Sequence, residues 1–188
     1  MCIRDRLKAE HLSVSFFTDA GEVEAVRDVS FTVEKGEVLA IVGESGCGKS
    51  ALCKSIMKLL PKTAKIKSGK ILVNGADITD YTEKNMSRLR GELFSMVFQD
   101  PMTGTAATME IQENLAMALR RGKSRGLGWG IKKNEKDFYR EALAQLDLGL
   151  QTRMTSKVGL LSGGQRQALT LLMATLQKPK LLLLDEHT

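Results

Sequence analysis

An eight-residue segment, residues 43–50, constrains this chain more than any other part of its sequence. It reads Gly-Glu-Ser-Gly-Cys-Gly-Lys-Ser and fits the pattern Gly-x4-Gly-Lys-Ser. A short apolar run precedes it at residues 37–42, as in strands that are buried on both faces of a parallel sheet. Apolar residues at helical spacing follow it from Leu52 to Leu60, and Pro61 marks the end of this predicted helix. Strand, glycine-rich loop and helix together predict an α/β fold.

This loop pattern binds phosphate in proteins, because each residue type in it has a chemical role. Glycines allow successive backbone N–H groups to converge on phosphate oxygens, and the helix N-terminus adds a positive partial charge. Lys49 is placed for the β and γ phosphates of a nucleotide, and the Ser50 hydroxyl can ligate Mg²⁺. A turn that only caps a helix is the alternative. The predicted nucleotide-binding residues are Gly43, Glu44, Ser45, Gly46, Cys47, Gly48, Lys49, Ser50 and Ala51.

Two adjacent carboxylates, Asp185 and Glu186, follow a second apolar run that we interpret as a buried strand, residues 180–184. Neighbouring side chains on a strand point in opposite directions. Asp185 can therefore support the Mg²⁺ shell while Glu186 faces an attacking water as general base. An ordinary strand end gives the same pattern, so this interpretation depends on the motifs that accompany it.

Those motifs include residues 161–165, which read Leu-Ser-Gly-Gly-Gln and begin a largely apolar helix. Ser162 and Gln165 have the spacing of a capping box. Gly163 and Gly164 leave backbone N–H groups bare at the helix start, which favours an anion there. The segment predicts a second anion site. The alternative, a helix cap alone, does not require two glycines.

Alternation and helical spacing locate the remaining elements. The predicted strands are residues 7–17, 26–33, 71–73 and 94–98, and the predicted helices are residues 109–121 and 137–148. The first two strands are expected to form an antiparallel layer. The two amphipathic helices indicate a helical subdomain, at about residues 104–160, that is inserted into the α/β core.

Composition excludes several classes of protein. With 188 residues, 43% hydrophobic and 27% charged, the chain has the profile of a globular domain. Its longest wholly apolar runs have four or five residues, against roughly 20 for a membrane span, and the N-terminus lacks the apolar region of a secretory signal. The basic, glycine-rich stretch 120–136 could meet nucleic acid or anionic lipid. We favour a solvated loop there, because Trp129 is its one aromatic residue and no nucleic-acid-binding module surrounds it.

The loop, Gln99, residues 161–165 and residues 181–186 occur in an order that resembles the ATP-binding cassette of ABC transporters. The resemblance covers nearly the whole chain from Leu7. It implies that ATP and Mg²⁺ bind, and that Gln99 contacts the Mg²⁺ and the water and couples the site to a membrane partner. It also implies that two cassettes, identical or different, pair head to tail. The signature residues of one chain, Ser162, Gly163 and Gly164, would then contact the γ-phosphate that Lys49 of the other chain holds.

The same resemblance implies partners and a location. A separate transmembrane permease would hold the chain at the cytoplasmic face of the plasma membrane, as a peripheral protein, and ATP hydrolysis would drive solute import. No direct contact with nucleic acid is expected. Phe16 corresponds to an aromatic residue that stacks on adenine in the family. A core residue of the first strand is the alternative, and Phe17 could take its place.

The sequence departs from the family pattern in three respects. It ends at Thr188, before the segments that carry the family's D-loop and switch histidine, so we expect a truncated cassette in residues 7–188. Residues 7–102 resemble ATPases of dipeptide and oligopeptide importers, whereas residues 103–188 resemble another importer branch, which suggests two joined genes. Residues 1–6 match neither branch and are expected to be a non-native leader.

The predicted function is therefore that of an ATP-binding and ATP-hydrolysing subunit of a peptide or amino-acid importer. One alternative is a soluble ABC ATPase that acts on ribosomes or DNA. Such proteins usually carry tandem cassettes or long coiled-coil insertions, and neither is visible in this sequence. The other alternative is a nucleotide-binding fragment without turnover.

Overall fold

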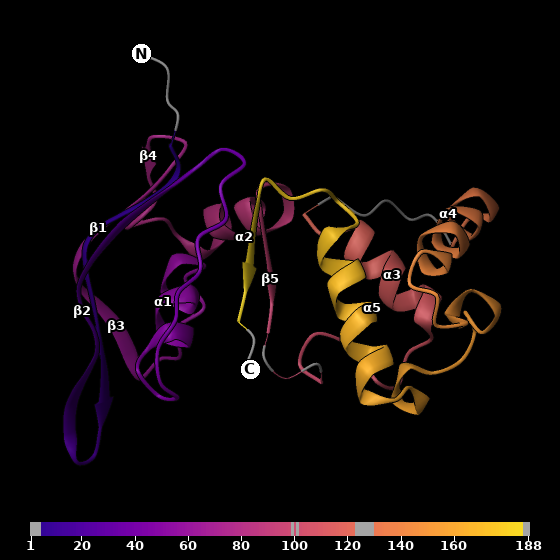
Figure 1. Cartoon of the computed structure of the whole chain (residues 1–188), viewed down its shortest axis with the longest axis horizontal. Coiled ribbons are helices and arrows are strands. Elements are labelled where there is room, and N and C mark those ends of the chain that lie inside the picture. The colour runs from indigo at the N-terminus through magenta and orange to yellow at the C-terminus, as the bar shows by residue number, and fades with distance from the viewer. Residues whose placement is uncertain (1–4, 99, 101, 123–129, 186–188) are drawn as a thin grey trace. The chain divides into compact units, whose positions relative to one another are not determined.

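The computed structural model describes residues 5–98, 100, 102–122 and 130–185, and Figure 1 labels its helices and strands. The chain divides into two compact units, Met1–Met86 and Ser87–Thr188. The first holds an antiparallel sheet and the second a parallel pair of strands, which confirms the predicted α/β class. Within the described ranges, no helix is long and apolar enough to cross a membrane.

The first unit is built on a four-stranded antiparallel sheet with the order β2-β1-β3-β4. Its strands are β1 (Asp5–Thr18), β2 (Gly21–Glu34), β3 (Ala64–Val73) and β4 (Ala76–Asp77). The predicted antiparallel pair is confirmed, with longer strands than expected. Asn74 and Gly75 have positive φ angles of 49° and 80° and form the predicted turn between β3 and β4. Helix α1 (Lys49–Ile56) packs on β1 and β2.

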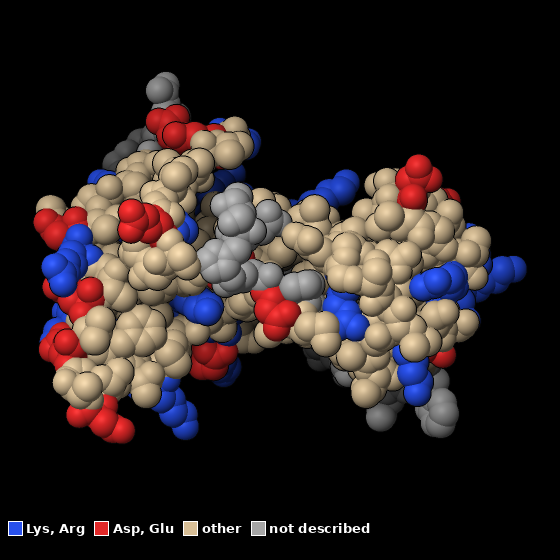
Figure 2. Space-filling view, turned by 60° about the horizontal axis from the view of Figure 1, so that its bottom comes forward, with Lys and Arg blue, Asp and Glu red and all other residues tan. Residues whose placement is uncertain are grey.

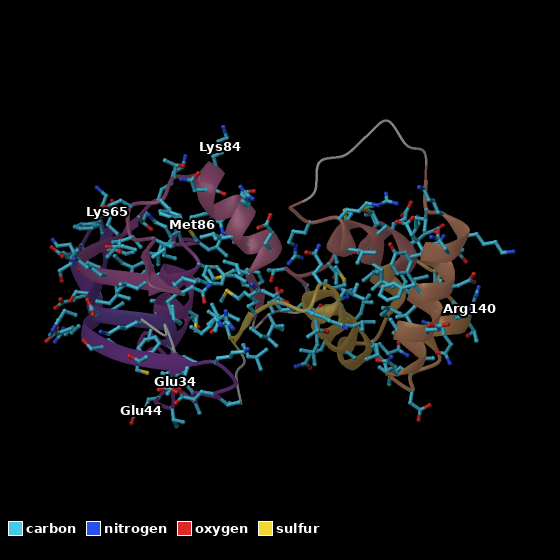
Figure 3. All side chains as sticks on the ribbon, turned by 90° about the horizontal axis from the view of Figure 1, so that it is seen from above. Glu34, Glu44, Lys65, Lys84, Met86 and Arg140 are labelled. Carbon is cyan, nitrogen blue, oxygen red and sulfur yellow. The ribbon has the colours of Figure 1, made fainter. Side chains whose placement is uncertain are left out.

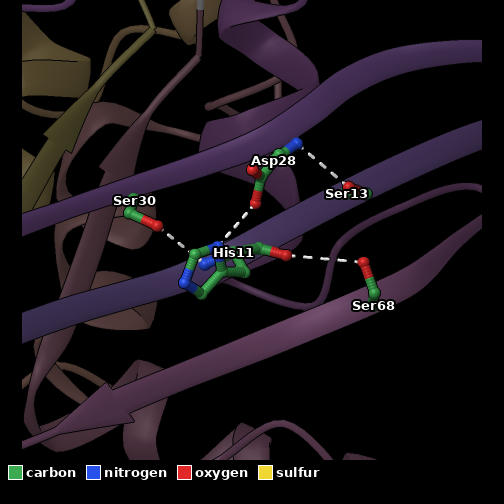
Figure 4. A network of polar contacts seen from close by, with 5 residues as sticks. All are labelled: His11, Ser13, Asp28, Ser30 and Ser68. Carbon is green, nitrogen blue, oxygen red and sulfur yellow. Dashed lines mark hydrogen bonds and ion pairs between the residues drawn. The ribbon is translucent and has the colours of Figure 1, made fainter.

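A bulge distorts β1 and β2 midway along the sheet. His11 and Asp28 both have positive φ angles, and the register between the two strands shifts on either side of them. Figure 4 shows how polar contacts hold this bulge: His11 Nδ1 lies 2.7 Å from an Asp28 carboxylate oxygen, and the His11 N–H donates to Ser30 Oγ at 2.8 Å. The Asp28 N–H donates to Ser13 Oγ at 3.0 Å, and Ser68 Oγ donates to the His11 carbonyl at 3.4 Å. A bulge of this kind bends and twists the paired strands.

Two predictions for the first unit are wrong. Residues 37–42 do not form a strand, and Val38 and Val42 are 93% and 92% exposed. A strand needs a neighbour that supplies hydrogen-bond partners, and none of the four strands of this unit pairs with the run. Helix α1 ends at Ile56 rather than near Pro61, because Lys58 takes a left-handed conformation with a φ of 50°. The Lys58 ammonium also donates to the carbonyls of Thr79 and Tyr81.

The second unit combines two parallel strands with a group of helices. Strand β5 (Phe94–Val97) pairs with β6 (Leu181–Leu184) in the register Val97 to Leu184. Its helices are α3 (Ile111–Leu119), α4 (Lys133–Ala144) and α5 (Gly163–Thr175), with short 3-10 helices at Leu150–Thr152 and Val158–Leu160. Helix α2 (Glu83–Glu92), which the sequence reasoning missed, runs across the boundary between the units. The two predicted amphipathic helices are thus present, with α4 beginning four residues earlier than expected.

The apolar faces of α3, α4 and α5 meet in one core. Its fully buried side chains are Ile111, Leu115, Tyr139, Leu143, Leu150, Val158 and Leu169. Arg140 lies on the opposite, exposed face of α4, where it pairs with Asp137 at 2.8 Å (Figure 3). This core fixes the direction in which α5 begins, which matters because α5 carries the Ser-Gly-Gly-Gln motif at its N-terminus.

Glu135 ties the start of α4 to the end of α3. Its carboxylate accepts from the Lys132 N–H at 2.8 Å and from the Arg120 guanidinium at 2.9 Å. The Lys132 N–H is the main reason why the pKa of Glu135 is lowered, and Arg120 adds to the effect. Arg120 is therefore engaged within the protein.

In the face that Figure 2 shows, basic and acidic side chains are interspersed rather than gathered in one basic surface. Residues 123–129 of the predicted basic stretch, Trp129 included, lie outside the described residues.

Candidate nucleotide-binding site

The predicted phosphate-binding loop folds around its own lysine. Helix α1 begins directly after Gly48, whose φ is 100°, and Gly46 has a φ of 82°. The Lys49 ammonium donates to the carbonyls of Gly43 and Glu44, both at 2.6 Å. Because phosphate oxygens are acceptors of the same kind and carry more charge, an ammonium held in this way is oriented for a phosphate.

Two glycines of the loop are required by the atoms around them. A Cβ on Gly43 would lie 2.7 Å from Cys47 Sγ, and a Cβ on Gly48 would lie 2.2 Å from the carbonyl oxygen of Ala25 on β2. The second contact shows that the loop packs directly against backbone of the antiparallel sheet. Cys47, one of the predicted nucleotide-binding residues, is exposed and has its sulfur 3.6 Å from Lys49 Nζ. The loop therefore has the tight backbone curvature that a bound phosphate chain fits.

The Gly48→Ala substitution is expected to lower the free energy of unfolding by roughly 3 kcal/mol, since a methyl group would meet backbone and a positive φ would be strained. Gly46→Ala is the matched control. It has the same kind of positive φ but open space within 4 Å, so it should cost roughly 1 kcal/mol. Urea unfolding of both variants measures the difference. Equal losses would contradict the close packing of Gly48 on Ala25.

Phe16 lies in the part of the sheet that the loop contacts. It is half-buried on β1 and pairs with Val23 on β2, two residues from the Ala25 carbonyl. Phe17, the other candidate, is 38% exposed, and the ammonium groups of Lys65 and Lys67 lie 5.8 and 5.5 Å from its ring centre. Two lysines therefore already occupy the surroundings of Phe17. The adenine-stacking role of Phe16 stays a prediction.

The second motif forms a capped helix N-terminus, as predicted. Ser162 is the N-cap of α5: the Gln165 N–H donates to Ser162 Oγ at 3.3 Å, and the Ser162 N–H donates to Gln165 Oε1 at 3.2 Å. Cβ atoms on Gly163 and Gly164 would meet nothing within 4 Å, and no acidic residue lies in the first turn. Packing among the described residues thus gives no reason for the two glycines. An anion that approaches the bare N–H groups would give one.

The carboxyl end of β6 carries the metal-binding candidate. Asp185 is 8% exposed, and its N–H donates to the Val97 carbonyl at 2.9 Å, so it continues the pairing of β6 with β5. Because the strands are parallel, their carboxyl ends share one edge of the sheet. Gln99, the residue expected to contact the Mg²⁺ and the water, lies outside the described residues, as does Glu186, the predicted general base. The structure therefore gives the geometry of Asp185 alone from this group.

Two buried polar side chains on α5 were missed by the sequence reasoning. Arg166 and Thr170 are 4% and 5% exposed. The helix was interpreted as largely apolar, so these positions were not singled out. Their spacing of four residues, which places them on one face of the helix, is the signal that could have found them.

The sequence matches the family model described as ABC transporter over residues 26–188. The chain belongs to the ABC transporter family. Solved cassettes have the same fold: the dimeric structure of MJ0796, a bacterial ABC transporter cassette, superposes with a TM-score of 0.80 at 22% identity, covering 95% of this chain and 72% of that one. CbiO1 of Clostridium perfringens gives a TM-score of 0.69 at 26% identity, covering 97% of this chain and 66% of that one.

Curated members of the ABC transporter family align with nearly the whole chain. The dipeptide transport ATP-binding protein DppD of Bacillus subtilis is 42% identical over 187 residues, which are 97% of this chain and 53% of that protein. A tyrosine transport ATP-binding protein of Clostridioides difficile is 38% identical over 183 residues, 97% of this chain and 69% of that protein. The chain thus spans about half the length of DppD. The DppD match runs through residues 99–103, and the hypothesis of two joined genes stays a prediction that sequencing the locus would test.

Proposed function

We propose that this ABC cassette binds Mg²⁺ and ATP and hydrolyses ATP to power a peptide or amino-acid importer. The observation that carries the proposal is the glycine-rich loop at the start of α1, in which the carbonyls of Gly43 and Glu44 orient the Lys49 ammonium. The names of the relatives, which are transport ATP-binding proteins for dipeptides, oligopeptides and tyrosine, supply the class of solute.

The proposed division of work follows from the residue types. The loop N–H groups and Lys49 bind the β and γ phosphates, and Phe16 stacks on adenine. Ser50, Asp185 and Gln99 would hold Mg²⁺, which supplies positive charge to the phosphate oxygens. Glu186 takes the proton of the attacking water, and Gln99 orients that water. The buried position of Asp185 fits this donor set, since a carboxylate with limited access to bulk water holds a cation more strongly.

A second cassette, of the same or a different chain, completes the proposed site. The bare N-terminus of α5, with Ser162, Gly163, Gly164 and Gln165, would bind the γ-phosphate that Lys49 of the other cassette holds. This arrangement explains why one chain carries two anion-binding features. It also makes turnover depend on dimer formation.

A membrane permease is the proposed partner, and it would place the chain at the cytoplasmic face of the plasma membrane. The experiment is to purify the tagged chain from its native cells in detergent and identify what accompanies it. Integral membrane subunits of an importer, together with ATP turnover that rises when solute and its binding protein are added, would support the proposal. Ribosomes or DNA in place of a permease would contradict it and favour a soluble ABC ATPase.

A further inference from the structure

A small cavity lies in the second unit, where α3 and α5 end and β5 begins (Figure 1). Its volume is about 10 Å³, which is room for one group of the size of a water molecule. The polar residues that line it are Arg90, Ser95, Arg121 and Gln177, and apolar side chains of α3, α5 and β5 form most of the remaining wall. No carboxylate is among the described residues that line this cavity.

Arg121 brings a positive charge to the cavity. Burial lowers the pKa of its guanidinium, although the residue as a whole is exposed, so the charged end is partly withdrawn from water. No carboxylate contributes to this shift of the pKa, and none pairs with Arg121 among the residues that the structure describes. An anion that donates no charge to any other group would replace the lost water around this guanidinium.

Gln177 fixes the backbone of Arg121 at the end of α3. Its amide nitrogen, Nε2, donates to three carbonyls, those of Ala118, Leu119 and Arg121, at 2.8, 2.9 and 3.1 Å. A helix leaves its last carbonyls without intrahelical donors, so Gln177 caps α3 from the segment that follows α5. The wall of the cavity is thus held by bonds within the protein, and a ligand would find a site that is already formed.

Arg90 and Ser95 complete the polar part of the wall. Arg90 lies in the last turn of α2, and Ser95 is 4% exposed on β5. Cations are favoured near the C-termini of helices, which gives each of the two arginines a structural reason to be there. That reason does not explain why two like charges, which disfavour each other, line one cavity. A ligand with negative charge does explain it.

We propose that this cavity is a binding site for a phosphate ion, one oxygen of which enters it against Arg90, Arg121 and Ser95. Two guanidinium groups match a dianion better than they match the single charge of a carboxylate, and their N–H groups and the serine hydroxyl are donors for phosphate oxygens. Because the cavity has room for one water-sized group, the other phosphate oxygens stay at its mouth. The site is distinct from the loop around Lys49, which belongs to the first unit, and it does not require ATP turnover.

Titration of the whole chain with inorganic phosphate, followed by amide chemical shifts, tests the site and locates it. The amides of Ser95, Arg121 and Gln177 should shift with a dissociation constant on the order of 1 mM, as expected for a few charge-assisted hydrogen bonds. Shifts confined to residues 43–50 would place phosphate only in the loop and would overturn the proposal. The absence of shifts around the cavity up to about 20 mM phosphate, well above the expected constant, would overturn it as well.

The Arg121→Gln substitution removes the charge and leaves the cap of α3 in place, because Gln177 bonds to the Arg121 carbonyl. The dissociation constant measured at Ser95 and Gln177 should rise at least about tenfold, the loss expected for one charge-assisted hydrogen bond. Arg153→Gln is the matched control, since Arg153 is an exposed arginine of the same unit outside the cavity, and its constant should stay within about twofold. Equal constants in Arg121→Gln and the unmodified chain would show that the cavity does not hold the phosphate.

Two further probes separate a free phosphate ion from other sources of negative charge. Acetate at the same ionic strength should bind at least about tenfold more weakly than phosphate, because it carries one charge. Equal binding of acetate would contradict a phosphate site and favour a carboxylate. Vesicles of phosphatidic acid present the same group on a lipid, and they should sediment no more of the unmodified chain than of Arg121→Gln. Sedimentation that depends on Arg121, without binding of the free ion, would overturn the proposal in favour of a lipid headgroup.

Discussion

The Glu186→Gln substitution is expected to stop ATP turnover and to leave binding of Mg²⁺ and ATP nearly unchanged. Glutamine has the shape of glutamate but cannot accept the proton of the attacking water. General base catalysis of this kind contributes about 10²- to 10⁴-fold to a rate, so turnover should fall by that factor. Binding should persist because Lys49 and the loop N–H groups hold the phosphates in the ground state.

Single-turnover hydrolysis and equilibrium binding, measured on the same preparation, check this result. Glu92→Gln is the matched control, since Glu92 is an exposed carboxylate that pairs with Arg88 on α2. Its turnover should stay within about twofold of the unmodified chain. Turnover above a third of the original rate in Glu186→Gln would show that another group takes the proton, and the assignment of Glu186 would be wrong.

The Gly164→Asp substitution is expected to abolish turnover without harming the fold. A side chain at this position meets open space, and an aspartate near a helix N-terminus stabilises the helix by roughly 0.3–1 kcal/mol. The same carboxylate would repel the γ-phosphate of the second cassette. We expect a loss of at least about 100-fold in turnover with an unchanged or higher melting temperature. Gly164→Ala, which adds volume but no charge, is the control and should keep most of the activity.

Mixing variants tests whether the signature acts on the partner. A dimer of one Gly164→Asp chain and one Lys49→Ala chain contains one site with an intact loop and an intact signature, if the two come from different chains. Random pairing of equal amounts should then restore about a quarter of the original turnover. If loop and signature act within one chain, the mixture should stay inactive, and the proposed head-to-tail arrangement would be contradicted.

The parts of the site that sequence reasoning predicted well are local in the chain. Ser162 and Gln165 are three residues apart, so their capping box depends only on the first turn of α5. The start of α1 after Gly48 depends on a glycine conformation and on the lysine that follows it. The Asn74-Gly75 turn is set by two residues that accept positive φ. Neighbours in sequence decide such features, and spacing therefore predicts them.

The parts of the fold that sequence reasoning missed depend on contacts between residues that are distant in the chain. The run at residues 37–42 has the composition of a buried strand, but composition does not supply a pairing partner. The early end of α1 depends on Lys58, whose ammonium reaches carbonyls more than 20 residues away. Helix α2 has few apolar residues, so its periodicity gave no signal. The contact between Met102 and Arg166 joins residues 64 positions apart.

The central claim is that the loop around Lys49 binds ATP, and isothermal titration of the chain with Mg²⁺ and ATP tests it most directly. Lys49→Ala is the decisive variant, and Lys62→Ala, which removes an exposed lysine elsewhere in the first unit, is its control. Loss of two charge-assisted hydrogen bonds at about 1.5 kcal/mol or more each predicts an affinity loss of at least about 100-fold in Lys49→Ala. Lys62→Ala should bind as the unmodified chain does. Equal affinities in all three chains, or no binding by the unmodified chain, would contradict the account.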